Sequence, residues 1–256
     1  MRVDVFLVER GYAKSREAAK KSIDAALVKI DGRTVTKSGE KIDETLPHEV
    51  EFTPLIPYVS RGGLKLEEAL KAFGVDPTGM RAVDIGASTG GFTDCLLQHG
   101  ASCVVAVDSG HGQLSASLLA DGRVKSIEGL NARTLSLADI GEPCDIAVMD
   151  VSFISQTYIL PQIPALLVDG GIAITLIKPQ FEVGKSGVGK GGIVRHAEDR
   201  RAAVLRVAEA ARQAGLYIEG LIHSPICGGD GNREYLALFS MTNNDKTDGI
   251  VDSIKY

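Results

Sequence analysis

Two lysines and two acids stand beside apolar segments, where their chemistry could be used. Asp150 ends the apolar run IAVMD, Lys178 ends ITLIK, Glu234 precedes YLALF, and Lys65 lies at the start of the helical pattern SRGGLKLEEAL. A lysine can remove a proton only while it is neutral, and burial or a second nearby cation favours the neutral form. A carboxylate can orient the resulting ammonium. A single charged residue at a strand end usually faces water, so we expect proton transfer only if all four converge.

From Met80 onward, strand-type apolar runs alternate with helical patterns. The runs RAVDI, ASCVVAV, CDIAVM and GGIAITLI predict buried strands. This alternation indicates an α/β fold with a mostly parallel sheet and helices on both faces. Ligands bind at the carboxyl ends of the strands in such sheets, which is where Asp150 and Lys178 stand.

The glycine-rich turn DIGASTGG follows the first of these strands. Asp108 ends the next strand and is placed to accept hydrogen bonds from ribose hydroxyls. The spacing does not fit the G-x-G-x-x-G of dinucleotide enzymes. It resembles motif I of S-adenosylmethionine (SAM) methyltransferases, and a structural turn without a ligand is the alternative. The predicted cofactor residues are Asp84, Gly86, Ala87, Ser88, Thr89, Gly90, Gly91, Phe92, Asp108, Asn131 and Asp150, of which Phe92 fits a core position equally well.

Charge is divided unevenly along the chain. Between Lys14 and Lys41 there are eight Lys or Arg and four Asp or Glu, a local balance of +4, whereas the balance from residue 42 onward is −9. This asymmetry suggests a small basic module joined to an acidic domain. The same lysines could form an ordinary solvated helix face.

The order of elements near the N-terminus favours RNA. A helix that Ser15 can cap is followed by VKIDGRTV, where Asp31-Gly32 predicts a tight hairpin. RVDVFLVERGYAKSREAAKKSIDAALVKIDGRTV resembles the S4 RNA-binding domain, an α+β fold that grips structured RNA. The resemblance implies phosphate contacts from Arg2, Lys14, Ser15, Arg16, Lys20, Lys21 and Arg33.

The segments SRGGLKL, DIGASTGGFTD, DVSFIS, LIKPQFEVGK and GNREYL resemble the TlyA family, which joins an S4 domain to an FtsJ/RrmJ-like methyltransferase. The resemblance implies SAM-dependent 2′-O-methylation of cytidine in 16S or 23S rRNA. It implies a K-D-K-E tetrad of Lys65, Asp150, Lys178 and Glu234, with Lys178 as the base. The expected organisation is an S4-like domain over 1–55, a linker over 56–60, a methyltransferase domain over 61–242 and a weakly ordered tail over 243–256.

The loop GKSGVGK, residues 184–190, imitates part of a P-loop. Gly191 stands where a P-loop needs Ser or Thr, so nucleotide triphosphate hydrolysis is a poor interpretation. Two interpretations remain: a basic flap near the RNA entry, with Lys185 and Lys190, or a plain flexible connection. Arg61, beside Lys65, is a further predicted RNA contact.

Composition bounds the remaining possibilities. The chain has 256 residues, a net charge of −5 and four cysteines without C-x-x-C spacing. We therefore expect reduced thiols, no metal site, no signal segment and a cytoplasmic location. Two alternatives to an rRNA methyltransferase are a haemolysin, a label that the family has carried, and a non-catalytic RNA-binding factor of ribosome assembly.

Overall fold

The computed structural model describes residues 1–184, 187–229, 231–243 and 246–256, and it divides into two compact units, Met1–Pro57 and Tyr58–Tyr256. The predicted linker contains this division. Lys185 lies outside the described residues. Within the described ranges, no helix is long and apolar enough to cross a bilayer.

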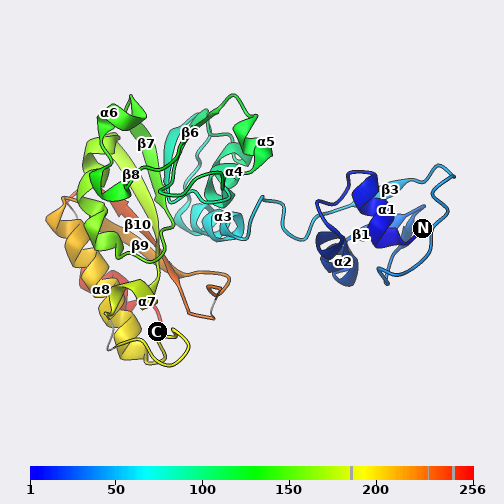
Figure 1. Cartoon of the computed structure of the whole chain (residues 1–256). Helices are drawn as coiled ribbons and strands as arrows, with labels where there is room; N and C mark the ends of the chain where they lie inside the picture. Colours follow the sequence, from blue (N-terminus) through cyan, green and yellow to red (C-terminus); the bar gives the residue numbers. More distant parts are fainter. Residues whose placement is uncertain (185–186, 230, 244–245) are drawn as a thin grey trace. The chain divides into compact units, whose positions relative to one another are not determined.

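Unit 1 is a small α+β domain (Figure 1). Ser15 caps its second helix by accepting a hydrogen bond from the backbone amide of Ala18 at 3.2 Å. The predicted hairpin is confirmed, because Ile30 pairs with Arg33 and both turn residues have positive φ. The elements are α1 (Val3–Glu9), α2 (Arg16–Asp24), β1 (Val28–Ile30), β2 (Arg33–Thr34) and β3 (Val50–Phe52).

Unit 2 contains a seven-stranded sheet in the order β6-β5-β4-β7-β8-β10-β9, in which β10 is antiparallel to its neighbours. The predicted α/β class and mostly parallel sheet are confirmed. The elements are α3 (Gly62–Phe73), β4 (Arg81–Ile85), α4 (Gly91–Gln98), β5 (Cys103–Val107), α5 (Ala116–Leu119), β6 (Val124–Ile127), η1 (Ala132–Thr134), α6 (Leu137–Ile140), β7 (Cys144–Met149), η2 (Gln156–Tyr158), η3 (Leu160–Leu166), β8 (Leu167–Ile177), α7 (Pro179–Glu182), α8 (Ala197–Gln213), β9 (Tyr217–His223), β10 (Tyr235–Ser240) and α9 (Thr247–Asp252).

Helices cover both faces of this sheet, with α3 and α4 on one face and α8 on the other (Figure 1). Alternate side chains of β4 point to opposite faces. Val83 and Ile85 join the core that includes Val204 and Val207 of α8, whereas Asp84 points toward α4. The strand order reverses between β4 and β7, where ligands bind in open sheets of this kind.

The C-terminal segment differs from the prediction of a weakly ordered tail. Residues Thr247–Asp252 form α9, in which Val251 is fully buried. The ring of Tyr256 lies 5.3 Å from that of Tyr235 in β10. A few apolar contacts therefore hold this polar segment against the sheet.

Candidate active site

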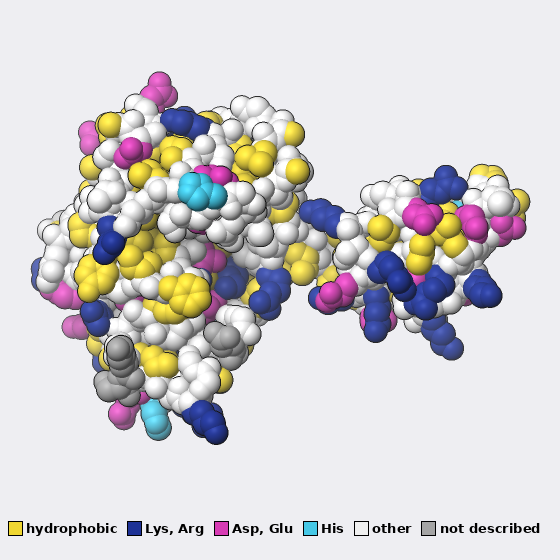
Figure 2. Space-filling view, viewed as in Figure 1, with side chains coloured by type: hydrophobic (Ala, Val, Ile, Leu, Met, Phe, Trp, Pro, Cys, Tyr) yellow, Lys and Arg dark blue, Asp and Glu magenta, His cyan; other side chains and the backbone are white. Residues whose placement is uncertain are grey.

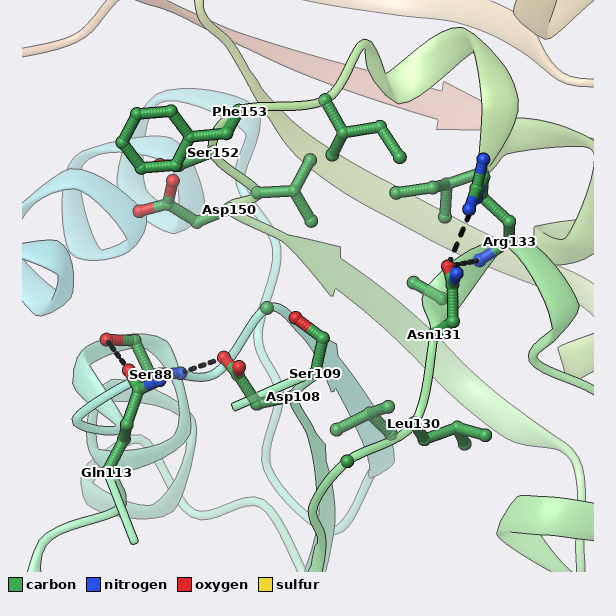
Figure 3. Close-up of a pocket in the computed structure, with 17 residues that line it drawn as sticks. Ser88, Asp108, Ser109, Gln113, Leu130, Asn131, Arg133, Asp150, Ser152 and Phe153 are labelled. Carbon is green, nitrogen blue, oxygen red and sulfur yellow. Dashed lines mark hydrogen bonds between the residues drawn. The ribbon is translucent and has the colours of Figure 1, made fainter. Parts of the chain in front are cut away.

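A cavity of about 570 Å³ lies at the carboxyl ends of β4, β5 and β7 (Figure 3). The turn after β4 forms one wall. Gly86 has a φ of +84°, and a Cβ there would come within 2.7 Å of the carbonyl oxygen of Asp150. Only glycine fits this close approach of two strand ends.

Two predicted cofactor residues, Asp108 and Asn131, line this cavity, and each is fixed by hydrogen bonds. Asp108 accepts hydrogen bonds from the backbone amides of Ser88 and Gly110, each at 2.7 Å. Each carboxylate oxygen keeps a second lone pair that a ribose hydroxyl could use. Asn131 Oδ1 accepts from the backbone nitrogen of Arg133 at 3.1 Å and from its Nε at 3.3 Å (Figure 3). Asn131 therefore has its amide NH₂ left as a donor, which suits a ring nitrogen of adenine.

Asp84 is fully buried at the end of β4, at the edge of a second cavity. Its Oδ2 accepts from Thr93 N at 2.9 Å and from Thr93 Oγ1 at 2.7 Å. In the described part of the chain, Oδ1 has no hydrogen-bond partner. Burial raises the pKa of Asp84 to about 7, against the lowering effect of the Thr93 hydrogen bonds. An orphaned carboxylate oxygen in a cavity suits a cationic group such as the α-ammonium of SAM.

The second cavity, of about 270 Å³, adjoins the first, and Gly86, Ser88, Asp150 and Ser152 line both. Its lining also includes Lys178, Lys65, Ser60, Arg61, Gly62, Asp84, Ala87, Thr89, Gly91 and Phe92. Of the predicted donor-turn residues, Gly86 and Ser88 line both cavities, whereas Ala87, Thr89 and Gly91 line only the second. Phe92 is buried as well as cavity-lining, so both interpretations of it apply.

Lys178 meets Asp150 at the carboxyl ends of the neighbouring strands β8 and β7. Its Nζ lies 2.5 Å from Asp150 Oδ1 and donates a hydrogen bond to Ser152 Oγ at 2.8 Å. The ammonium is therefore held from two sides at the wall shared by both cavities. Ser152 was not predicted from the sequence, and only its proximity to Asp150 signals it.

Lys65 and Glu234 form the other amine–carboxyl pair. Lys65 Nζ donates to Glu234 Oε2 at 2.5 Å, and both side chains are buried. Lys65 lies in α3 and lines the second cavity. Glu234 directly precedes β10, does not line that cavity, and accepts the hydrogen bond from Lys65. The structure thus brings all four predicted catalytic residues into two adjacent ion pairs.

Phe153 is a further residue that the sequence did not single out. It has a φ of +64°, which is costly for a bulky side chain, and 93 % of its surface is exposed. Its ring lies 5.4 Å from that of Phe181 and lines the mouth of the first cavity (Figure 3). On the face shown in Figure 2, hydrophobic side chains of unit 2 gather beside acidic and basic ones. Strain and exposure at such a mouth indicate a ligand contact.

The side chains of unit 1 that are predicted to contact RNA differ in whether they already form ion pairs within the protein. Arg2 and Arg16 both pair with the buried Asp4, at 2.9 and 3.2 Å. Lys14 and Lys20 are exposed, and no ion pair is recorded for them among the described residues. Three further predicted contacts are engaged locally: Lys21 with Glu17 at 2.8 Å, Arg33 with Glu40 at 2.6 Å, and the Ser15 hydroxyl in the cap of α2.

The basic loop after α7 is tied down at its far end. Asn232 is buried, accepts from Val194 N at 2.9 Å and donates to Gly192 O at 2.8 Å. Lys190 of this loop and Arg61 at the start of α3 are both exposed. The far end of the loop is therefore fastened two residues before Glu234.

A sheet of this order, with a glycine-rich turn after β4 and an acid after β5, defines the Rossmann-like methyltransferase class. Residues 58–241 match the family described as FtsJ-like methyltransferase, and residues 1–45 match the S4 domain. The chain belongs to the FtsJ-like methyltransferase family, in the branch that carries an S4 domain.

Individual relatives extend this result. The chain is 49 % identical over 237 residues to YqxC of Bacillus subtilis, a candidate rRNA methyltransferase, covering 92 % of this chain and 84 % of the relative. It is 43 % identical to the 16S/23S rRNA (cytidine-2′-O)-methyltransferase TlyA of Mycobacterium tuberculosis, covering 96 % of this chain and 91 % of that one. The solved structure of a candidate hemolysin from Streptococcus thermophilus is 42 % identical, with a TM-score of 0.73 and coverage of 99 % and 94 %.

Proposed function

We propose that this protein methylates the 2′-hydroxyl of a cytidine in ribosomal RNA, with SAM as the methyl donor. The observation that carries the proposal is the pair of Lys–carboxyl contacts at the smaller cavity, which Lys65, Asp150 and Lys178 line. The larger cavity is suited to the nucleoside part of the donor, and the smaller one, which Asp84 lines, to the α-ammonium end of the donor and to the ribose. The activity named for the M. tuberculosis relative supports the choice of cytidine and rRNA.

SAM, when bound, supplies an electrophilic methyl group on a sulfonium. Gly86, Asp108 and Asn131 would hold its nucleoside part, and Asp84 its α-ammonium. In the smaller cavity, Lys178 in its neutral form would accept the proton of the 2′-hydroxyl while that oxygen takes the methyl group from the sulfonium. Alignment of the hydroxyl with the methyl group supplies much of the acceleration.

The remaining charged groups have supporting roles in this proposal. Asp150 and Ser152 hold Lys178 Nζ toward the ribose and stabilise the ammonium that forms. Glu234 fixes Lys65, whose charge can contact a ribose oxygen or the adjacent phosphate. Each partner is already in place before the substrate arrives, which lowers the cost of assembling the site.

The test is direct. Purified protein is incubated with labelled SAM and separately with each ribosomal subunit, with whole ribosomes and with free rRNA, and ribose methylation is mapped. The proposal expects label at the 2′-oxygen of a cytidine. Binding of SAM and RNA without transfer to any of these substrates would instead favour a non-catalytic assembly factor.

Phe153 provides a test of how the acceptor is held. Stacking of a base on an exposed aromatic ring contributes about 1–3 kcal/mol. Phe153→Ala should therefore raise the KM for RNA by about tenfold, with the Kd for SAM unchanged. Phe153→Tyr keeps a stacking face and is the matched control. Equal KM values for the alanine variant and the wild type would remove Phe153 from the RNA contact.

The basic part of unit 1 provides a second test. Over Met1–Pro57, ten basic and ten acidic side chains balance, so any RNA attraction must be local. In Figure 2, most Lys and Arg side chains of unit 1 that are in view lie along its lower edge, although basic side chains also lie at its upper edge and acidic ones at its lower left. We expect these cations to include the phosphate contacts.

Removing Lys14 and Lys20 together should weaken RNA binding. It should also reduce the dependence of log Kd on log salt concentration by about 1.5, because each phosphate contact releases roughly 0.7–0.9 counterion. Lys21→Ala is the control, since that ammonium is already paired with Glu17. Binding titrations from low to moderate salt measure both effects, and an unchanged slope would contradict this assignment.

A further inference from the structure

Helix α7 and the loop after β7 carry the groups that face the acceptor, and two contacts already join them. Lys178, the N-cap residue of α7, contacts Asp150 and Ser152 of the loop. In the middle of both segments, the rings of Phe153 and Phe181 lie 5.4 Å apart. The relative placement of these two segments therefore decides where the base and the exposed ring point.

A third contact joins the end of the loop after β7 to helix α7, and Glu182 makes it. This residue ends α7, and its carboxylate accepts a hydrogen bond from Ser155 Oγ at 2.5 Å and one from the backbone nitrogen of Gln156 at 3.0 Å. Arg206 of α8 donates to the backbone oxygen of Glu182 at 2.8 Å. The carboxylate thus caps the short helix η2, which begins at Gln156.

Glu182 is an unusual choice for this position. It is only 2 % exposed and lines neither of the two cavities. Burial raises the pKa of Glu182, and the hydrogen bonds from Ser155 and Gln156 oppose that rise. A buried carboxyl is costly unless it is hydrogen-bonded, and an apolar residue would fill the space at lower cost. The two hydrogen bonds that its carboxylate accepts both come from the end of the loop.

We propose that Glu182 is a positioning residue that fixes the loop 151–156 against α7, and through it the orientation of Lys178 and Phe153 toward the RNA. This inference rests on the proposed function of the site. The Glu182 carboxylate contacts the loop through two hydrogen bonds, one from the Ser155 hydroxyl and one from the backbone amide of Gln156.

The two ends of the loop are held independently. The backbone nitrogen of Asp150 donates to Ile85 O of β4 at 3.0 Å, so the start of the loop is tied to the sheet. The hydrogen bonds to Glu182 hold its end to α7, and Gln156 Nε2 also donates to Leu176 O of β8 at 3.4 Å. Between them, Phe153 keeps its costly positive φ, which persists only where the surroundings enforce it. Loss of Glu182 should release residues 151–156, of which 151–154 line the larger cavity, and leave Asp150, Asp108 and Asn131 in place.

The experiment compares the full-length wild type with Glu182→Ala and Glu182→Gln. Single-turnover methylation at saturating SAM should fall about 30-fold in the alanine variant, because small misplacements of reacting groups have large effects on rate. Glutamine retains an acceptor for Gln156 and a polar partner for Ser155, so its rate should stay within about threefold of wild type. The Kd for SAM should change less than about threefold in both variants.

Hydrogen exchange gives a readout that does not depend on RNA. Peptides covering 151–157 should exchange faster in Glu182→Ala alone, while those covering 86–92 remain as in wild type. The stability control is Asp145→Ala, which removes a carboxylate cap from Arg81 N, 2.8 Å away at the amino end of β4. That variant should lose melting temperature but keep its methylation rate.

The results that would overturn this inference differ from the result that would overturn the proposed function. Wild-type methylation in Glu182→Ala, or equal losses in the glutamine and alanine variants, or unchanged exchange over 151–157, would overturn the inference. A wild type that methylates no ribosomal substrate would instead overturn the proposed function, and the exchange comparison alone would then decide the role of Glu182.

Discussion

Replacement of Lys178 by alanine should slow methyl transfer by about a thousandfold while the Kd for SAM changes less than about threefold. The hydroxyl of a ribose is a weak nucleophile, and a positioned general base contributes about 10²–10⁴ in rate. Lys178 contacts Asp150 and Ser152 and has no recorded hydrogen bond or ion pair among the described residues with Asp84, Asp108 or Asn131, the groups proposed to hold the donor, so donor binding should depend little on it. Single-turnover rates with the methylated rRNA substrate and calorimetric titration with SAM measure the two quantities.

Lys178→Arg separates a base from a fixed positive charge. The guanidinium keeps the charge beside Asp150 but does not release its proton near neutral pH, so this variant should be as slow as the alanine one. Lys125→Ala is the surface control, because that residue lies on the edge strand β6 and its ammonium donates to the backbone oxygens of Asp139 at 3.1 Å and Ile140 at 3.5 Å. Substantial activity in Lys178→Arg would leave the lysine an electrostatic role and remove it as the base.

Part of this site could be predicted from the sequence for a geometric reason. Asp150 and Lys178 each end an apolar strand-type run, and neighbouring parallel strands bring their carboxyl ends to one edge. Lys65 and Glu234 follow no such rule, since one comes from a helix before the sheet and the other precedes an antiparallel strand. Only the resemblance to a known family assigned them to the same cleft.

Other features depend on contacts that spacing does not encode. The positive φ of Phe153 arises from the loop being held at both ends, and DVSFIS alone is compatible with a buried phenylalanine. Glu182 meets Ser155 across 27 positions, through two segments whose packing only the fold determines. The polar composition of the C-terminal segment did not indicate that Val251 is buried.

The second large effect concerns Asp84, whose loss should weaken SAM binding while it removes a pH-dependent cost to stability. Asp84→Asn keeps an oxygen for the two Thr93 donors but replaces the free carboxylate oxygen with an amide NH₂. That group cannot accept from the α-ammonium of SAM. We expect the Kd for SAM to rise by at least about tenfold at pH 8, consistent with one charged hydrogen bond.

The stability effect has the opposite sign. The pKa of Asp84 is raised from its ordinary value of 3.8 to about 7 on folding, so the folded protein binds more protons than the unfolded chain between these values. Stability from this group is fully present below about pH 4 and is lost as the pH rises toward and through 7. Between pH 5 and pH 8 the loss amounts to roughly 2–3 kcal/mol, because each pKa unit corresponds to about 1.36 kcal/mol.

Urea unfolding of the full chain without SAM, followed by circular dichroism at pH 5 and pH 8, measures this difference. The wild type should lose roughly 2–3 kcal/mol more than Asp84→Asn between the two pH values, and Asp145→Asn, at the other end of the sheet, should behave like the wild type. In parallel, the affinity of the wild type for SAM should increase as Asp84 ionises around pH 7, and that of Asp84→Asn should not. Identical pH profiles for the two proteins would show that Asp84 neither titrates in this range nor holds the donor. The burial that makes this carboxyl costly to the free protein also leaves its second oxygen without a hydrogen-bond partner in the described part of the chain, which is the group proposed to meet the α-ammonium.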